Sequence, residues 1–355
     1  MTASHFGTVS GKEAALGTLG LGDLMVNRLG FGAMRITGRD IWGPPPDRAA
    51  AIRLLRRVVE LGITLIDTAD SYGPGVSEEL IAEALAPYPD GLVIATKGGL
   101  TRPRSGEWRR DGRPAHLRAA CESSLKRLRT DRIDLYQLHS PDPRVPLEDS
   151  IGALVQLQRE GKVRHIGISN VEVSELDAVR RVANIVAVQN RYNLTDRSSE
   201  PVLSKCERDG IAFLPWSPLS AGSDTARVSG AIAAVAARHR ATAAQVAIAW
   251  LLARSPVMLP IRLVLARSHR GERAGRAPAA ERCRSPSARL TEVWFAQSPG
   301  SIEDEPSGLN GAVRCGARTR CVGIKIRQSG SLCLRCRWRA AESCRARQEL
   351  RNSTA

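Results

Sequence analysis

Short apolar runs alternate with amphipathic segments between about residue 29 and residue 261. The runs are rich in β-branched residues and end in polar residues or glycine, which is typical of strands buried on both faces. These predicted strands are residues 29–34, 63–69, 91–97, 133–139, 164–169, 185–190, 211–217 and 257–261. Between them, apolar residues recur with the period of a helix, which predicts helices at 47–62, 77–86, 116–129, 146–162, 174–183, 200–210 and in a segment that ends at residue 255.

This alternation predicts an α/β fold with a parallel sheet and crossover helices. Over roughly 250 residues such units close into a (β/α)8 TIM barrel, whose active site lies at the carboxyl ends of the strands. A doubly wound open sheet is the alternative, but it would carry a G-x-G-x-x-G loop after its first strand, which residues 30–38 do not match. Residues 16–30 predict an N-terminal β-hairpin with a Gly22-Asp23 turn, which would plug the barrel floor.

The positive charge is concentrated at one end of the chain. The formal net charge is +16, and residues 261–355 hold 19 of the 52 basic and 8 of the 36 acidic residues. The charge therefore says little about what the barrel binds. No apolar run is long enough to span a membrane, and the first residues do not resemble a signal peptide, so we expect a cytoplasmic protein.

Four chemically distinct residues lie at the ends of consecutive predicted strands: Asp67, Tyr72, Lys97 and His139. The Lys97 ammonium would need a partner there, and Asp67 is the obvious one, although an ion pair that only joins two strands would look the same. A tyrosine beside this cation is expected to have a pKa below about 10, so that it exchanges protons near neutrality. His139 would share a hydrogen bond with a substrate oxygen. Together the four predict a proton-transfer site.

Neutral polar residues and an aromatic residue end the next three strands: Ser169, Asn170, Gln189 and Trp216. Amide and hydroxyl groups around a flat ring suit a planar ligand that carries an amide, such as nicotinamide. Ser169 and Asn170 would also serve simply to cap the following helix.

The motifs IDTADSYG, ATKGG, DRIDLYQLHSPD, REGKVRHIGISN, VAVQNRYN and FLPWSPL together resemble the aldo-keto reductase superfamily, from about Leu16 to Ile261. The resemblance implies a barrel that transfers a hydride from NADPH, with NADH not excluded, to a carbonyl. By position, Tyr72 resembles the general acid of that family, Asp67 and Lys97 the pair that tunes it, and His139 the group that orients the substrate. The implied cofactor-binding residues are Met34, Ser169, Asn170, Gln189, Trp216, Ser217, Leu219 and Gly222, and Trp42 and Trp108 would line the substrate pocket.

We therefore predict an NAD(P)H-dependent reductase of a small aldehyde or ketone, without a metal. The GFGAMRITG and GISN stretches resemble a bacterial branch that includes pyridoxal reductases, which makes pyridoxal one candidate substrate. The alternative is a catalytically impaired, cofactor-binding redox sensor or partner subunit on the same barrel. Binding of nucleic acid is not expected, because its only support is the basic C-terminal segment.

The resemblance breaks after Ile261, where the family continues with a P-G turn and an E-N pair that grip the adenosine end of the cofactor. Residues 262–355 instead contain 18 arginines, one lysine and six of the eight cysteines. A phosphate-binding extension, a metal module around the C-x2-C at 333–336, and a frameshifted, disordered tail are the alternatives, and we favour the last. We thus divide the chain into a flexible segment 1–15, a barrel 16–261 whose final helix is in doubt, and a disordered or frameshifted tail 262–355, and we expect weakened NADPH binding.

Overall fold

The computed structural model describes residues 17–219 and 225–262. Within this part of the chain the predicted barrel is confirmed, because eight parallel strands form one sheet. Adjacent strands of this sheet are hydrogen-bonded to each other, and their order across the sheet is β11 (Ala212–Phe213), β10 (Ile185–Gln189), β9 (Val163–Ser169), β8 (Ile133–Leu138), β5 (Val93–Gly98), β4 (Leu65–Asp67), β3 (Gly30–Gly32) and β12 (Ile261–Arg262).

The segment that contains β12 closes the sheet. β12 pairs with β3, and three residues earlier Met258 forms a parallel bridge with Phe213 of β11. The Phe213 amide donates to the carbonyl of Val257 (2.8 Å), and the Leu259 amide donates to the carbonyl of Phe213 (2.9 Å). One short segment therefore pairs with both edge strands of the eight-stranded sheet and closes it into a barrel.

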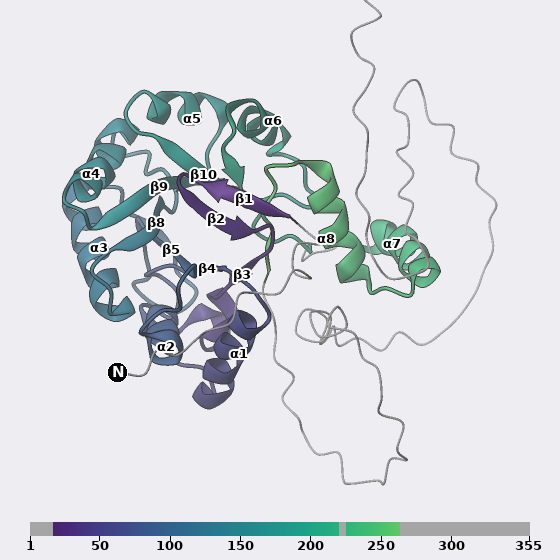
Figure 1. Ribbon diagram of the computed structural model, residues 1–355. Coiled ribbons are helices and arrows are strands. Elements are labelled where there is room, and N and C mark those ends of the chain that lie inside the picture. Colours follow the sequence, from purple (N-terminus) through teal and green to yellow (C-terminus); the bar gives the residue numbers. More distant parts are fainter. Residues whose placement is uncertain (1–16, 220–224, 263–355) are drawn as a thin grey trace, which may run out of the picture. The chain divides into compact units, whose positions relative to one another are not determined.

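Helices lie outside the ring of strands (Figure 1). Asp47 caps the first helix, since its side chain accepts a hydrogen bond from the Ala50 amide at 2.7 Å. The helices are α1 (Arg48–Glu60), α2 (Val76–Leu85), α3 (Pro114–Leu128), α4 (Leu147–Arg159), α5 (Val173–Arg180), α6 (Glu200–Asp209), α7 (Thr225–His239) and α8 (Ala243–Arg254).

The last helical segment differs from the prediction, because it consists of two helices. Arg240 has a positive φ of 49°, which ends α7, and Thr242 starts α8 with a capping box to Gln245. The Thr-x-x-Gln spacing at Thr242 is the sequence signal for this second helix start. The predicted flexible segment 1–15 lies outside the described residues, and so does the predicted C-terminal tail except for Arg262, which ends β12.

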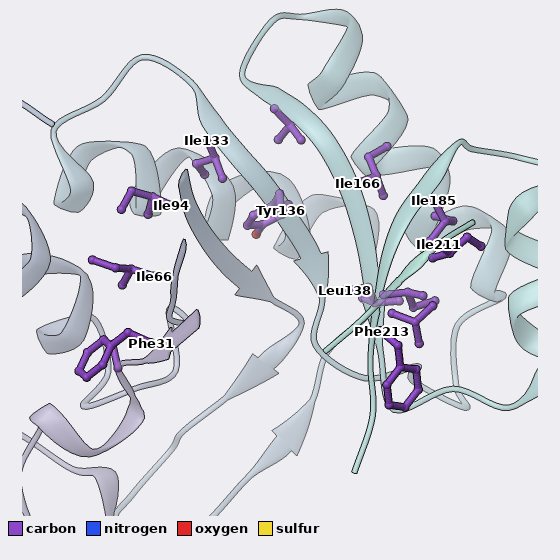
Figure 2. Packing of buried hydrophobic residues seen from close by; sticks show 14 of the residues in the cluster. Phe31, Ile66, Ile94, Ile133, Tyr136, Leu138, Ile166, Ile185, Ile211 and Phe213 are labelled. Atoms are coloured by element: carbon purple, nitrogen blue, oxygen red, sulfur yellow. The ribbon is translucent and has the colours of Figure 1, made fainter. Parts of the chain in front are cut away.

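Alternation along the strands separates an outer core from an inner one. Figure 2 shows side chains of the outer core, between the sheet and the helices, among them Phe31, Ile66, Ile94 and Tyr136. Leu65, Ala95 and Leu135 occupy the intervening positions and belong to a second cluster inside the barrel. These strands are thus buried on both faces, as their continuous apolar runs predict.

The predicted hairpin is confirmed and covers one end of the barrel (Figure 1). β1 (Thr18–Leu21) and β2 (Leu24–Asn27) pair antiparallel around the Gly22-Asp23 turn. Leu21 and Val26 are buried in the inner cluster. The hairpin therefore fills the end of the barrel opposite the strand carboxyl ends with apolar side chains.

Candidate active site

The same alternation places polar side chains inside the barrel, above the inner apolar cluster. Leu65 is followed two residues later by Asp67, and Ala95 is followed two residues later by Lys97. On β8, Leu135 is followed by Gln137 and then His139, again two residues apart. These four polar side chains are all buried.

Lys97 and Asp67 form the predicted ion pair. The Lys97 ammonium donates to Asp67 Oδ2 at 2.7 Å and to the Thr68 carbonyl at 2.8 Å. The other carboxylate oxygen, Oδ1, accepts from the side-chain amides of Gln137 (3.1 Å) and Gln189 (2.8 Å). Every oxygen of the buried carboxylate is therefore paired, which is what a charge removed from water requires.

Three rings meet edge to face beside this pair. The Tyr72 ring centroid lies 5.8 Å from that of His139 and 6.5 Å from that of Trp108. Trp108 and His139 are 6.4 Å apart by the same measure. Lys97 Nζ lies 5.2 Å from the centre of the Tyr72 ring. The structure thus brings together all four members of the predicted proton-transfer site and one of the two predicted pocket tryptophans.

The predicted direction of the Tyr72 pKa is wrong for this state of the protein. Burial raises the pKa of Tyr72 above its usual value, and the attraction of Lys97 only partly offsets this. For Lys97, burial alone would lower the pKa, but Asp67 and Tyr72 outweigh it and raise the pKa. Burial, helped by the charge of Lys97, holds the pKa of His139 well below its usual value. At neutral pH the site therefore contains a protonated phenol and an uncharged imidazole.

The three residues expected to hold a carboxamide lie next to each other at the ends of β9 and β10. Ser169 Oγ donates to the Gln189 carbonyl at 2.6 Å. Asn170, which has a positive φ of 60°, donates from Nδ2 to the His139 carbonyl at 2.9 Å and accepts from Trp216 Nε1 at 2.9 Å. This set of uncharged donors and acceptors beside a partly exposed indole suits an uncharged planar amide, so it fits the nicotinamide half of NADPH.

The remaining predicted residues are less closely connected to this centre. Met34 begins a short 3-10 turn after β3, and Leu219 packs against the outer core. Ser217 has a positive φ of 54° and accepts a hydrogen bond from Asn193 at its carbonyl. Trp42 contacts the site through Arg102, whose Cζ lies 5.5 Å from the Trp42 ring centroid. Gly222 lies outside the described residues.

Two residues of this region were not predicted. Gln137 donates a hydrogen bond to Asp67. It could have been predicted from the sequence, because it lies two residues before His139 and therefore on the same face of the strand. Arg102 is buried and its Cζ lies only 3.8 Å from the Trp108 ring centroid. No local pattern distinguishes Arg102 from the other arginines in its loop.

The described part of the chain contains neither grouped metal ligands nor a membrane-spanning helix. Over residues 17–219 and 225–262, no three His, Cys, Asp or Glu side chains are grouped as metal ligands would be. In the same residues, no helix is both long and apolar enough to cross a membrane.

Comparison with known proteins agrees with this geometry. Residues 28–270 match the sequence profile of the Aldo/keto reductase family. An uncharacterized oxidoreductase of Schizosaccharomyces pombe is 48% identical over 245 residues, which are 69% of this chain and 79% of that protein. Pyridoxine 4-dehydrogenase of Escherichia coli is 43% identical over 250 residues, 69% of this chain and 87% of that protein.

Solved structures of similar fold are oxidoreductases as well. A glycerol dehydrogenase from Gluconobacter oxydans superposes with a TM-score of 0.63 at 29% identity, covering 70% of this chain and 86% of that one. An aldo-keto reductase from Klebsiella pneumoniae in complex with NADPH superposes with a TM-score of 0.56 at 27% identity, covering 67% and 81%. The chain therefore belongs to the aldo/keto reductase family of oxidoreductases.

Proposed function

We propose that this protein reduces an aldehyde or ketone to an alcohol with NADPH, and that Tyr72 is the general acid. The observation that carries the proposal is the position of the Tyr72 ring, 5.2 Å from a lysine ammonium and 5.8 Å from a buried imidazole. Its family and an NADPH-bound structural relative support the choice of cofactor. Ser169, Asn170 and Gln189 would hold the nicotinamide carboxamide, and Trp216 would face its ring.

The chemistry that NADPH supplies when bound is a hydride for the carbonyl carbon. Tyr72 donates a hydrogen bond to the carbonyl oxygen and gives up its proton as negative charge develops there. The resulting phenolate is stabilised by the adjacent Lys97 ammonium. Asp67 keeps that ammonium in place, and the phenol regains its proton from solvent.

His139 has a different part in this proposal. Because the pKa of His139 is well below its usual value, the imidazole is neutral at pH 7 and does not compete as a charged acid. Its Nδ1 lies 3.4 Å from Ser71 Oγ, which limits rotation of the ring. The imidazole would orient the carbonyl oxygen toward Tyr72 through a hydrogen bond.

The pocket rings favour a flat substrate, and the similarity to pyridoxine 4-dehydrogenase makes pyridoxal one candidate. The test is to mix the purified full chain with NADPH and a panel of aldehydes that includes pyridoxal, and to follow both NADPH absorbance and the alcohol product. Turnover that depends on the aldehyde supports the proposal. NADPH binding without turnover of any aldehyde or ketone would contradict it.

A further inference from the structure

Arg102 connects three backbone carbonyls from two different loops. It lies on the loop between β5 and α3, directly after the short strand β6 (Leu100–Thr101), and only 7% of its surface is exposed. Its Nε donates to the Glu107 carbonyl at 2.9 Å. Its Nη1 and Nη2 donate to the carbonyls of Ile41 and Asp40, each at 3.1 Å. A guanidinium can serve three acceptors in one plane, which an ammonium cannot.

The turn that Arg102 holds contains a residue, Ile41, in a backbone conformation that it disfavours. Asp40 and Ile41 have φ values of 58° and 59°. A β-branched residue such as Ile41 is rarely found in this left-handed region, because its side chain collides with the backbone. The Gly73 amide also donates to the Ile41 carbonyl, at 3.1 Å. The turn therefore persists through contacts to Arg102 and to the residue that follows Tyr72.

The same guanidinium contacts both tryptophans of the predicted substrate pocket. Its Cζ lies 3.8 Å from the Trp108 ring centroid and 5.5 Å from that of Trp42. Trp108 follows Glu107, whose carbonyl Arg102 binds, and precedes β7 (Arg109–Arg110), which pairs with β6. Although 39% of Trp108 is exposed, its ring keeps its edge-to-face position beside Tyr72 and His139.

We propose that Arg102 is a positioning residue that determines substrate specificity. It fixes the Trp42 turn and the Trp108 hairpin as one preformed aromatic wall beside Tyr72, and this wall favours aromatic and heteroaromatic aldehydes over short aliphatic ones. The inference rests on the proposed reductase function. Arg102 does not touch the reacting atoms, so its loss changes the binding of flat substrates and leaves the chemical step in place.

The first test compares Arg102→Lys and Arg102→Met with wild type, using pyridine-4-carbaldehyde and propanal. Arg104→Lys is the matched control, because Arg104 lies in the same loop with 80% of its side chain exposed. We expect KM for the aromatic aldehyde to rise by about tenfold, as loss of the guanidinium's hydrogen bonds and of its contacts with the two tryptophan rings would predict. The kcat, the KM for propanal and the Kd for NADPH should stay near wild type. Equal losses for both aldehydes, or wild-type behaviour of both variants, would overturn the proposal.

Chemical rescue provides a second readout. Arg102 borders a surface cavity of ≈ 350 Å³, through which a small cation can reach its position. Added guanidinium, at concentrations that leave the melting temperature unchanged, should lower the KM of Arg102→Ala for the aromatic aldehyde and leave that of Arg104→Ala unaffected. Rescue of neither variant, or of both alike, would count against the proposal that the guanidinium of Arg102 positions the aromatic wall.

A third measurement separates this inference from the proposed function. Acrylamide quenching of tryptophan fluorescence requires no substrate, and it should increase in Arg102→Lys relative to Arg104→Lys. If wild type reduces no carbonyl compound but quenching increases in this way, the proposed function fails and the positioning role of Arg102 stands. If wild type is active and quenching is the same in both variants, the positioning role is wrong and the proposed function stands.

Discussion

The Lys97 ammonium donates to the Asp67 carboxylate at 2.7 Å, and both side chains are buried inside the barrel. The pair carries no net charge, so its attraction for a nearby phenolate is weaker than that of an isolated cation. This explains why burial dominates the pKa of Tyr72 and raises it. Lys97 still faces the phenol at short range, so it can respond once charge moves onto the tyrosine oxygen.

Tyr72→Phe should remove most of the reductase activity. Phenylalanine keeps the ring beside Trp108 and His139 but has no proton to give, and general acids contribute about 10²–10⁴-fold to rates. We expect kcat to fall in that range while the Kd for NADPH and the melting temperature change little. Tyr88→Phe is the control, because the Tyr88 hydroxyl donates to a backbone carbonyl, that of Leu128, at 2.6 Å. A Tyr72→Phe variant with near wild-type kcat would rule out Tyr72 as the acid.

The pH profile should be flat through neutrality. A general acid works only while protonated, so its contribution is present below its pKa and lost above it. Because the pKa of Tyr72 is raised, kcat/KM for reduction should fall only above about pH 10. Because the pKa of His139 is well below 6.5, no second limb should occur near pH 6.5. In Lys97→Met the alkaline limb should move to higher pH while kcat falls.

This profile is measured as initial rates between pH 5 and 11, with melting temperature followed in the same buffers. An alkaline limb near pH 8 would show that Lys97 outweighs burial. It would then restore the lowered tyrosine pKa that the sequence alone suggested.

The sequence predicted the barrel and the position of its chemistry because both follow from local patterns. Apolar runs that lead into Asp67, Lys97 and His139 at corresponding places predict a polar rim without any knowledge of side-chain geometry. The pKa of Tyr72 was predicted in the wrong direction for a physical reason. Its value depends on how completely the phenol is buried and on whether Lys97 is already neutralised, and neither is encoded in sequence spacing.

Residues that act through long-range contacts were also missed. Arg102 lies about sixty residues from Asp40 and Ile41, whose carbonyls it binds. Such a contact depends on how two loops fold against each other, and no local sequence pattern encodes it. Gln137 could have been predicted from the sequence, since strand alternation alone puts it on the same face as His139.

Arg127→Met should destabilise the fold. Glu78 is completely buried and accepts from Arg127 Nε at 2.7 Å and from Thr96 Oγ1 at 2.6 Å. Removing Arg127 deprives this buried carboxylate of its charged partner and leaves it the neutral Thr96 hydroxyl. We expect a loss of about 3 kcal/mol in the free energy of unfolding, near the lower end for a broken buried ion pair.

The matched control for that change is Arg118→Met, which breaks a surface pair with Glu160 at 2.7 Å and should cost about 0–1 kcal/mol. Urea unfolding followed by far-UV circular dichroism gives both values. Equal costs for the two variants would mean that burial of Glu78 does not decide the strength of its pair.

Arg28→Met should loosen the seam of the barrel, which is the contact between β3 and the segment that leads into β12. Arg28 donates from Nη2 to the carbonyls of Leu252 (3.0 Å) and Ser255 (2.6 Å), at the end of α8, and from Nε to that of Met258 (3.4 Å). Hydrogen bonds to a charged group contribute about 1.5–3 kcal/mol each, and the longest of these is weak. We therefore expect a loss of about 2–4 kcal/mol in the free energy of unfolding.

The same change should speed hydrogen exchange most at the Gly30 amide, which donates to the Pro260 carbonyl across the seam at 2.9 Å. Arg164→Met, which removes a surface contact with Asp23, is the control, and the same exchange rate at Gly30 in both variants would show that Arg28 does not hold the seam.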